Sequence, residues 1–234
     1  MRERMKETPK LIENGVHLAA LIDRMGRLPL ALEQAAAYIC RTETGCEGYL
    51  GELDKAGLTV LDDNLSEPTT DYRRTVNATF TLLFGELSEE AQQLYLLCSY
   101  MAADRIPLEL FSKSIDKLPQ PLRNTAADNI DRIVAELLDY SLIARDGGYI
   151  STHRFVQQLY RERQDGRDAD YLMCCLDMTV EVFDYEYGTK EDFDSFAMNL
   201  PHVLEITGHV EERREITMRR LFWQGAYTTK PDLA

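Results

Sequence analysis

A glycine and a proline, three residues apart, mark the boundary between the first two predicted helices of this chain. Gly26 suits the end of a helix because glycine adopts a positive φ readily, and Pro29 suits the first turn of the next helix because no N–H donor is needed there. Residues 29 to about 41 are rich in Ala and Leu and apolar on nearly every side. They predict a helix buried inside a domain, preceded by an amphipathic helix that ends at Gly26.

Composition and periodicity divide the 234 residues into three segments. Residues 1–66 predict a small helical domain, with a short third helix near residues 48–55 and a polar linker at residues 62–70. Residues 72–165 predict helices near 74–84, 89–101 and 127–140, and Ile106 and Pro107 are expected to open another through residue 111. Residues 168–234 are predicted to be helical. Their expected apolar stripes are Leu172, Leu176, Val180 and Phe183, then Phe193, Phe196, Leu200, Val203, Leu204 and Ile206, with an interruption at Pro201.

The hydrophobic period changes from helical to alternating between residues 141 and 152. Two short apolar runs flank Asp146, Gly147 and Gly148, and glycine supplies the positive φ that a tight hairpin needs. Helices followed by one small hairpin form a winged-helix arrangement. The predicted fold class is therefore mainly α: a small helical domain, a winged helix with one short β-hairpin at residues 72–165, and the start of a helical repeat.

The net charge restricts the classes of binding partner that suit this chain, and the cysteine content restricts its cellular compartment. The formal net charge is −14, and so acidic a chain repels phosphate backbones and anionic membranes, which argues against nucleic acid and membranes as partners. Five cysteines without CxxC spacing favour free thiols in a reducing compartment. The sequence shows no signal peptide and no apolar run of membrane-spanning length, so we expect a cytoplasmic protein.

Motifs for catalysis are absent from the sequence. GxxxxGK[ST], GxSxG and HExxH do not occur, and none of the four histidines stands at metal-ligand spacing from another His or Cys. We therefore expect no catalytic residue, no metal site and no enzymatic activity of this chain alone.

Residues 26–32, GRLPLAL, closely resemble the GLPLA motif of the NB-ARC module of STAND-class signalling ATPases. Residues 152–157, THRFVQ, are similar to the histidine motif that follows the last strand of that family's winged helix. The resemblance implies that Pro29 packs against the adenine of a bound nucleotide and that His153 contacts the β-phosphate of ADP in the resting state. Thr152 and Arg154 depart from the Met and Asp of the family's motif, so only the histidine carries over. A neutral imidazole at a helix N-terminus is a suitable phosphate donor.

The resemblance covers about residues 9–163, the C-terminal half of the nucleotide-binding module. The P-loop domain that precedes this half in the family is missing from the sequence, which suggests a truncated piece, a degenerate gene or one half of a split system. Residues 221–227 are similar to the core of a tetratricopeptide repeat, and the helical C-terminal segment implies protein partners. The resemblance thus implies the regulatory and sensor portion of a nucleotide-dependent signalling switch. This portion has no cofactor of its own, and ADP or ATP binds only with the missing or separate P-loop domain.

Other functions stay open at this point. A winged helix often binds DNA, so a transcriptional regulator is the alternative function. The helix that would enter the major groove, residues 128–139, carries four acidic side chains and a single basic one, Arg132. Such a face repels phosphates. An enzyme is a further alternative, which no constellation of residues supports. The plain structural interpretations are an ordinary α-helical bundle at residues 26–41 and a histidine that only caps the last wing strand at residue 153.

Overall fold

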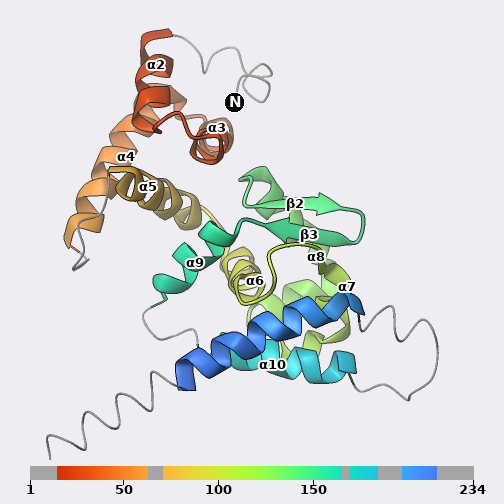
Figure 1. Ribbon diagram of the computed structural model, residues 1–234. Coiled ribbons are helices and arrows are strands. Elements are labelled where there is room, and N and C mark those ends of the chain that lie inside the picture. Colours follow the sequence, from red (N-terminus) through yellow and green to blue (C-terminus); the bar gives the residue numbers. More distant parts are fainter. Residues whose placement is uncertain (1–14, 63–70, 165–168, 184–196, 215–234) are drawn as a thin grey trace, which may run out of the picture. The chain divides into compact units, whose positions relative to one another are not determined.

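The computed structural model describes residues 15–62, 71–164, 169–183 and 197–214, which are mainly helical (Figure 1). The prediction of a mainly α fold with a short hairpin is confirmed. Residues 197–214 form the last described helix. The preceding elements, in chain order, are α2 (Gly15–Arg24), α3 (Pro29–Thr42), α4 (Gly45–Asp62), α5 (Asp71–Gly85), α6 (Glu89–Ser99), β1 (Ile106–Pro107), α7 (Leu108–Lys113), the 3₁₀ helix η2 (Ile115–Lys117), α8 (Leu122–Asp139), β2 (Ile143–Asp146), β3 (Tyr149–Thr152), α9 (Arg154–Glu162) and α10 (Ala169–Phe183).

The chain forms two compact units, each built from two stretches of sequence. The first contains residues 1–95 and 124–146, and the second contains residues 96–123 and 147–234. The division into domains at residues 1–66, 72–165 and 168–234 stays a prediction. The first residue of the linker predicted at residues 62–70 belongs to α4, which ends at Asp62. Residues 63–70 and the repeat-like residues 221–227 lie outside the described residues.

The turn between α2 and α3 has the conformation that the sequence predicts. Gly26 adopts φ +62°, and Arg27 follows with φ +58°. Leu28 is extended, and Pro29 then begins α3, so its fixed φ and missing N–H cost nothing there.

The core of the first unit surrounds α3, whose apolar side packs between α4 and α5. Tyr38 of α3 and Tyr49 of α4 lie with ring centroids 5.3 Å apart, and the hydroxyl of Tyr38 donates a hydrogen bond of 2.9 Å to Glu52. The buried residues of α3 are Ala31, Gln34, Ala35, Ala36, Ala37, Tyr38 and Ile39. These are seven of its fourteen residues, so α3 contributes to the core but, contrary to the prediction from its sequence, is not buried on nearly every side. Helix α4 extends far beyond the residues 48–55 predicted for it.

Helix α8, which belongs to the first unit from residue 124 onward, changes direction at Asn129, whose φ of −164° and ψ of 84° are not helical. The side chain of Asn129 accepts a hydrogen bond of 3.2 Å from the backbone N–H of Arg132, so it caps the second part of the helix. One turn later, Glu136 accepts hydrogen bonds from the backbone N–H of Ser88 at 2.6 Å and from its hydroxyl at 2.8 Å. The hydroxyl of Ser88 in turn accepts a hydrogen bond of 3.3 Å from the backbone N–H of Ala91, so Ser88 caps the N-terminus of α6.

The sheet has three strands in the order β1-β3-β2. Gly147 adopts φ +59° in the turn between β2 and β3, as the hairpin pattern predicts. The expected helix start at Ile106 and Pro107 was wrong: these residues form β1, with Ile106 opposite Ile150 of β3, and the helix begins one residue later. Strand β1 is at the sheet edge, where a proline is tolerated because no partner needs its N–H.

Helices α10 and 197–214 bury only part of the apolar stripes predicted for them. In α10, Cys175 and Met178 are fully buried beside Leu172, whereas Val180 is 68% exposed. In the last described helix, Ile206 is buried as predicted, together with Asn199 and His202, whereas Leu204 is 63% exposed. The helix runs through residue 201 without interruption. Both helices carry apolar residues on several faces, so hydrophobicity alone does not determine which face packs inward.

Candidate functional site

His153 stands between the last strand of the sheet and the first turn of α9. Its backbone is extended (φ −101°, ψ 123°), and its carbonyl accepts the first helical hydrogen bonds, from Val156 at 2.8 Å and Gln157 at 3.0 Å. The ring Nδ1 accepts a hydrogen bond of 3.3 Å from the backbone N–H of Phe155. Because Nδ1 is an acceptor in this contact, the neutral ring carries its proton on Nε2. His153 is exposed, so Nε2–H is a donor at the surface beside the α9 N-terminus.

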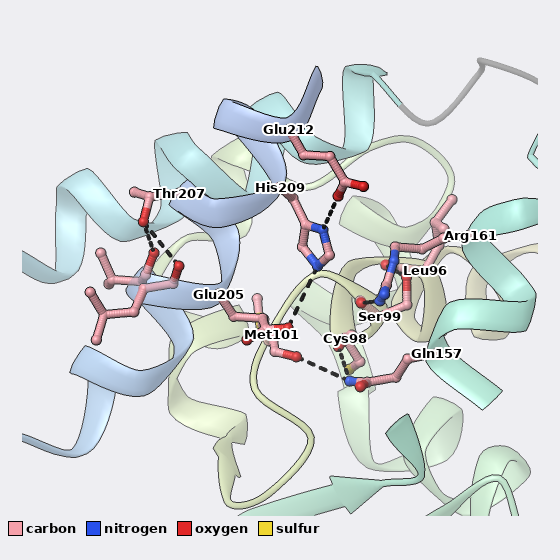
Figure 2. Close-up of polar contacts among 12 residues, drawn as sticks. Leu96, Cys98, Ser99, Met101, Gln157, Arg161, Glu205, Thr207, His209 and Glu212 are labelled. Atoms are coloured by element: carbon pink, nitrogen blue, oxygen red, sulfur yellow. Dashed lines mark hydrogen bonds and ion pairs between the residues drawn. The ribbon is translucent and has the colours of Figure 1, made fainter. Parts of the chain in front are cut away.

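Helix α9 is held in place by side chains on its buried face. Gln157 is 3% exposed, and its amide nitrogen donates to the carbonyls of Cys98 at 2.8 Å and Met101 at 3.1 Å. One turn on, the guanidinium of Arg161 donates to the carbonyl of Ser99. Figure 2 shows both side chains reaching the C-terminal end of α6, where carbonyls have no partner within the helix. Gln157 and Arg161 therefore fix the direction of the helix that begins after His153.

Pro29 lies at the start of α3 and is exposed. The preceding residue, Leu28, provides no side-chain hydrogen bond to the first N–H groups of the helix. The turn therefore presents an apolar ring next to backbone donors that no side chain of the cap satisfies. Pro29 belongs to the first unit and His153 to the second, and each is described only within its own unit. A shared nucleotide contact stays a prediction.

The acidic residues of the would-be recognition helix have partners inside the first unit. Asp131 forms an ion pair of 2.7 Å with Arg145 of β2, and Asp139 lies 3.6 Å from Arg41 of α3. Together with Glu136, which binds Ser88, these carboxylates fasten α8 to neighbouring elements. The sequence shows the charges of this helix but not their partners, which lie far away in the chain.

A second polar cluster was missed by the sequence analysis. His209, in the helix of residues 197–214, lies between the carboxylates of Glu205 and Glu212 (Figure 2). Its ring also contacts the ring of Tyr100. Arg161 of α9 also approaches the ring of Tyr100, with its guanidinium carbon 5.8 Å from the centroid. The sequence offered only two isolated histidines in a helical segment as a signal. Glu205 and Glu212 lie on the same helix, but Tyr100 and the carbonyl of Arg105 come from about 100 positions earlier.

The cysteines are all free thiols. Burial raises the pKa of Cys98 to about 12, and burial raises the pKa of Cys175 well above its usual value. Because the thiolate is the reactive form, these two side chains act as core residues at neutral pH rather than as nucleophiles.

Nowhere in the described part of the chain do three or more His, Cys, Asp or Glu side chains gather in a way that could bind a metal ion. Within the same ranges, every helix is too short or too polar to cross a membrane.

Residues 82–168 match the family model described as a domain of unknown function (DUF7779). The match extends from the end of α5 past α9, so it contains His153 and Gln157 but not Pro29. No curated protein and no solved structure matches the chain.

Proposed function

We propose that this chain is the regulatory and sensor portion of a STAND-type, nucleotide-dependent signalling switch, with the NB-ARC motifs at Pro29 and His153. In this proposal His153 donates a hydrogen bond from Nε2 to the β-phosphate of ADP. The observation that carries the proposal is the exposed imidazole at the α9 N-terminus, whose Nδ1 is already engaged by the N–H of Phe155. A ring in this state, next to the free N–H groups of a helix end, suits a phosphate oxygen.

Two further features support the same role. Gln157 belongs to the same THRFVQ motif as His153 and anchors α9 through two buried hydrogen bonds, so the donor stands on a fixed element. At Pro29, the exposed ring is positioned to pack against a flat apolar surface such as adenine. A P-loop domain, supplied by another segment or another protein, would contribute the phosphate cradle, and the helical C-terminal segment would bind protein partners in the cytoplasm.

DNA binding, the second candidate, has no observation in its favour. On α8, Asp131, Glu136 and Asp139 each fasten the helix to another part of the first unit. Their negative charges remain along the helix that would have to approach a phosphate backbone.

The test separates a phosphate contact from a simple helix cap. His153→Ala removes both the cap and the donor, whereas His153→Asn keeps a good N-cap residue but has no donor that reaches as far as Nε2. With the P-loop domain present, both variants should release ADP faster, roughly ten- to hundred-fold, since a hydrogen bond to a charged group contributes about 1.5–3 kcal/mol. In the chain alone, ADP should bind more weakly than about 1 mM, and His153→Asn should leave the melting temperature unchanged.

If His153 is only a structural cap, the rate of ADP release should not depend on it. His153→Ala would then lower the melting temperature of the chain, and neither variant would change the rate of ADP release. Stopped-flow release of a fluorescent ADP and thermal melts of the three proteins measure both quantities. An unchanged release rate for His153→Asn would end the proposed phosphate contact.

A further inference from the structure

The helix of residues 197–214 packs into the second unit along one narrow face that carries two histidines. Asn199, His202, Ile206 and His209 follow one another at intervals of three and four residues, which places them on a single stripe of the helix. His202 is 2% exposed, Ile206 is fully buried, and the side chain of His209 is 16% exposed. Imidazoles thus occupy positions that apolar side chains usually fill in a packed helix.

His202 fits this face only as a neutral ring. Its Nε2 lies 3.2 Å from the carbonyl oxygen of Arg105, so Nε2 carries the proton and donates. Its Nδ1 is buried and makes no hydrogen bond. A second proton on Nδ1 would place a positive charge in the interior, and burial accordingly lowers the pKa of His202, while the carbonyls of Arg105 and Ala102 offset part of this effect.

His209 faces a similar restriction. Its ring meets the ring of Tyr100 edge to face, with centroids 5.4 Å apart at 84°. Burial and the nearby Arg161 both lower the pKa of His209, and Glu205 and Glu212 oppose them. These two carboxylates lie 3.8 Å from the ring nitrogens, too far for hydrogen bonds, and are 54% and 70% exposed, so water screens their attraction.

We propose that protonation of His202 and His209 under mildly acidic conditions releases the helix of residues 197–214 from the second unit. The charged groups that act on His209 are Arg161 from α9 and Glu205 and Glu212 from the same helix. His202 instead meets the backbone carbonyl of Arg105, from the segment before β1, whose guanidinium lies over the ring of Tyr149. This inference concerns the packing of one helix and does not depend on the proposed nucleotide switch.

The sign of the pH dependence follows from the direction of the shifts. An undocked helix exposes both rings, which then titrate near the ordinary value of about 6.5. Since the docked rings have lower pKa values, docking is fully stable above about pH 6.5 and weakens as the pH falls below it. Each histidine can contribute at most about a tenfold loss of the docking equilibrium per pH unit, so the two together can contribute at most about a hundredfold.

Amide hydrogen exchange of the full chain measures the release directly. Protection of residues 197–214, corrected for the intrinsic exchange rate, should fall at least about fivefold between pH 7.5 and 5.5, within the bound set above for two histidines. Protection of α3 in the first unit should stay constant. This range lies above the ordinary titration of carboxylic acids, so histidines dominate the change.

The double variant His202→Gln and His209→Phe removes both titrating rings. Gln keeps an amide donor for the Arg105 carbonyl, and Phe keeps an aromatic edge toward Tyr100. The helix should then stay protected at pH 5.5. The matched control is His17→Gln, which removes a histidine of α2 in the first unit and should leave the pH dependence as it is in the natural sequence.

Constant protection of residues 197–214 down to pH 5.5 would overturn the proposal, and so would a pH dependence that persists in the double variant. If the double variant does not fold, magnetic resonance of the histidine rings in the natural sequence decides. Protonation of His202 and His209 must then occur over the same pH range as the loss of protection, and protonation without such a loss refutes the release.

Discussion

Replacing Gln157 by Met tests whether two amide hydrogen bonds hold α9 in place. Met has nearly the same length but offers no donor to the carbonyls of Cys98 and Met101. Cys98 keeps the N–H of Met101 as a partner at 3.1 Å, whereas the carbonyl of Met101 loses its amide donor. Two net hydrogen bonds of about 1 kcal/mol each, plus part of the cost of one unpaired buried carbonyl, give a loss of about 2–3 kcal/mol.

Native-state hydrogen exchange of the α9 amides measures this loss as faster opening, roughly thirty- to hundred-and-fifty-fold. At pH 7, Gln157→Glu should destabilise α9 more than Gln157→Met does, because a buried carboxylate would face two carbonyl oxygens. Burial raises the pKa of such a carboxyl, so its penalty grows as the pH rises above about 4.3 and shrinks as the pH falls toward that value.

Gln158→Met is the matched control, since Gln158 is exposed and bonds only its neighbour Glu162 at 2.8 Å. It should change the opening free energy by less than about 0.5 kcal/mol. The reasoning would be refuted if Gln157→Met were as mild as this control, or if the Glu and Met variants opened equally fast at pH 7.

Two further predictions concern a helix cap and a turn. Glu136→Ala removes the acceptor of both Ser88 hydrogen bonds and should lower the free energy of unfolding by about 1–3 kcal/mol in urea titrations. Asp128→Ala, at an exposed position of the same helix, should change it by less than about 0.5 kcal/mol, and equal effects would contradict the cap. Gly147→Ala should cost about 1–2 kcal/mol in thermal melts, because φ is +59° although no atom obstructs the new Cβ. Gly147→Asn should recover part of this loss, and an Ala variant as stable as the natural protein would disprove the assigned strain.

Local signals predicted most of the helices and the hairpin. Gly26, Pro29 and Gly147 each restrict the backbone at one position, and such restrictions act over a few residues whatever the rest of the chain does. Ser88 likewise caps α6 with a residue type that prefers that position. His153 was also found from sequence, through a motif resemblance, although its tautomer becomes evident only from the hydrogen bond to Phe155.

Features that depend on distant partners could not be predicted. Strand β1 exists because Ile106 pairs with Ile150, and nothing in the two residues of β1 shows this. The buried faces of the last two helices were only partly predicted, for a related reason. Leu172 and Ile206 are buried as expected, but Cys175 and His202 also turn inward because the second unit provides room and partners there. For the candidate site, the sequence contained Gln157 in a motif but gave no sign of the carbonyls that it binds.

The interleaving of the two units along the chain has a consequence for synthesis on the ribosome. The first unit needs residues 124–146, so it stays incomplete until residue 146 has emerged, and residues 96–123 must meanwhile wait for the rest of the second unit. At typical elongation rates of about 5–20 residues per second, the apolar residues of α3 and α6 lack part of their final environment for several seconds. We expect chaperones to bind such a nascent chain, and a translation pause before residue 146 would prolong the time during which its apolar residues are exposed and can misfold.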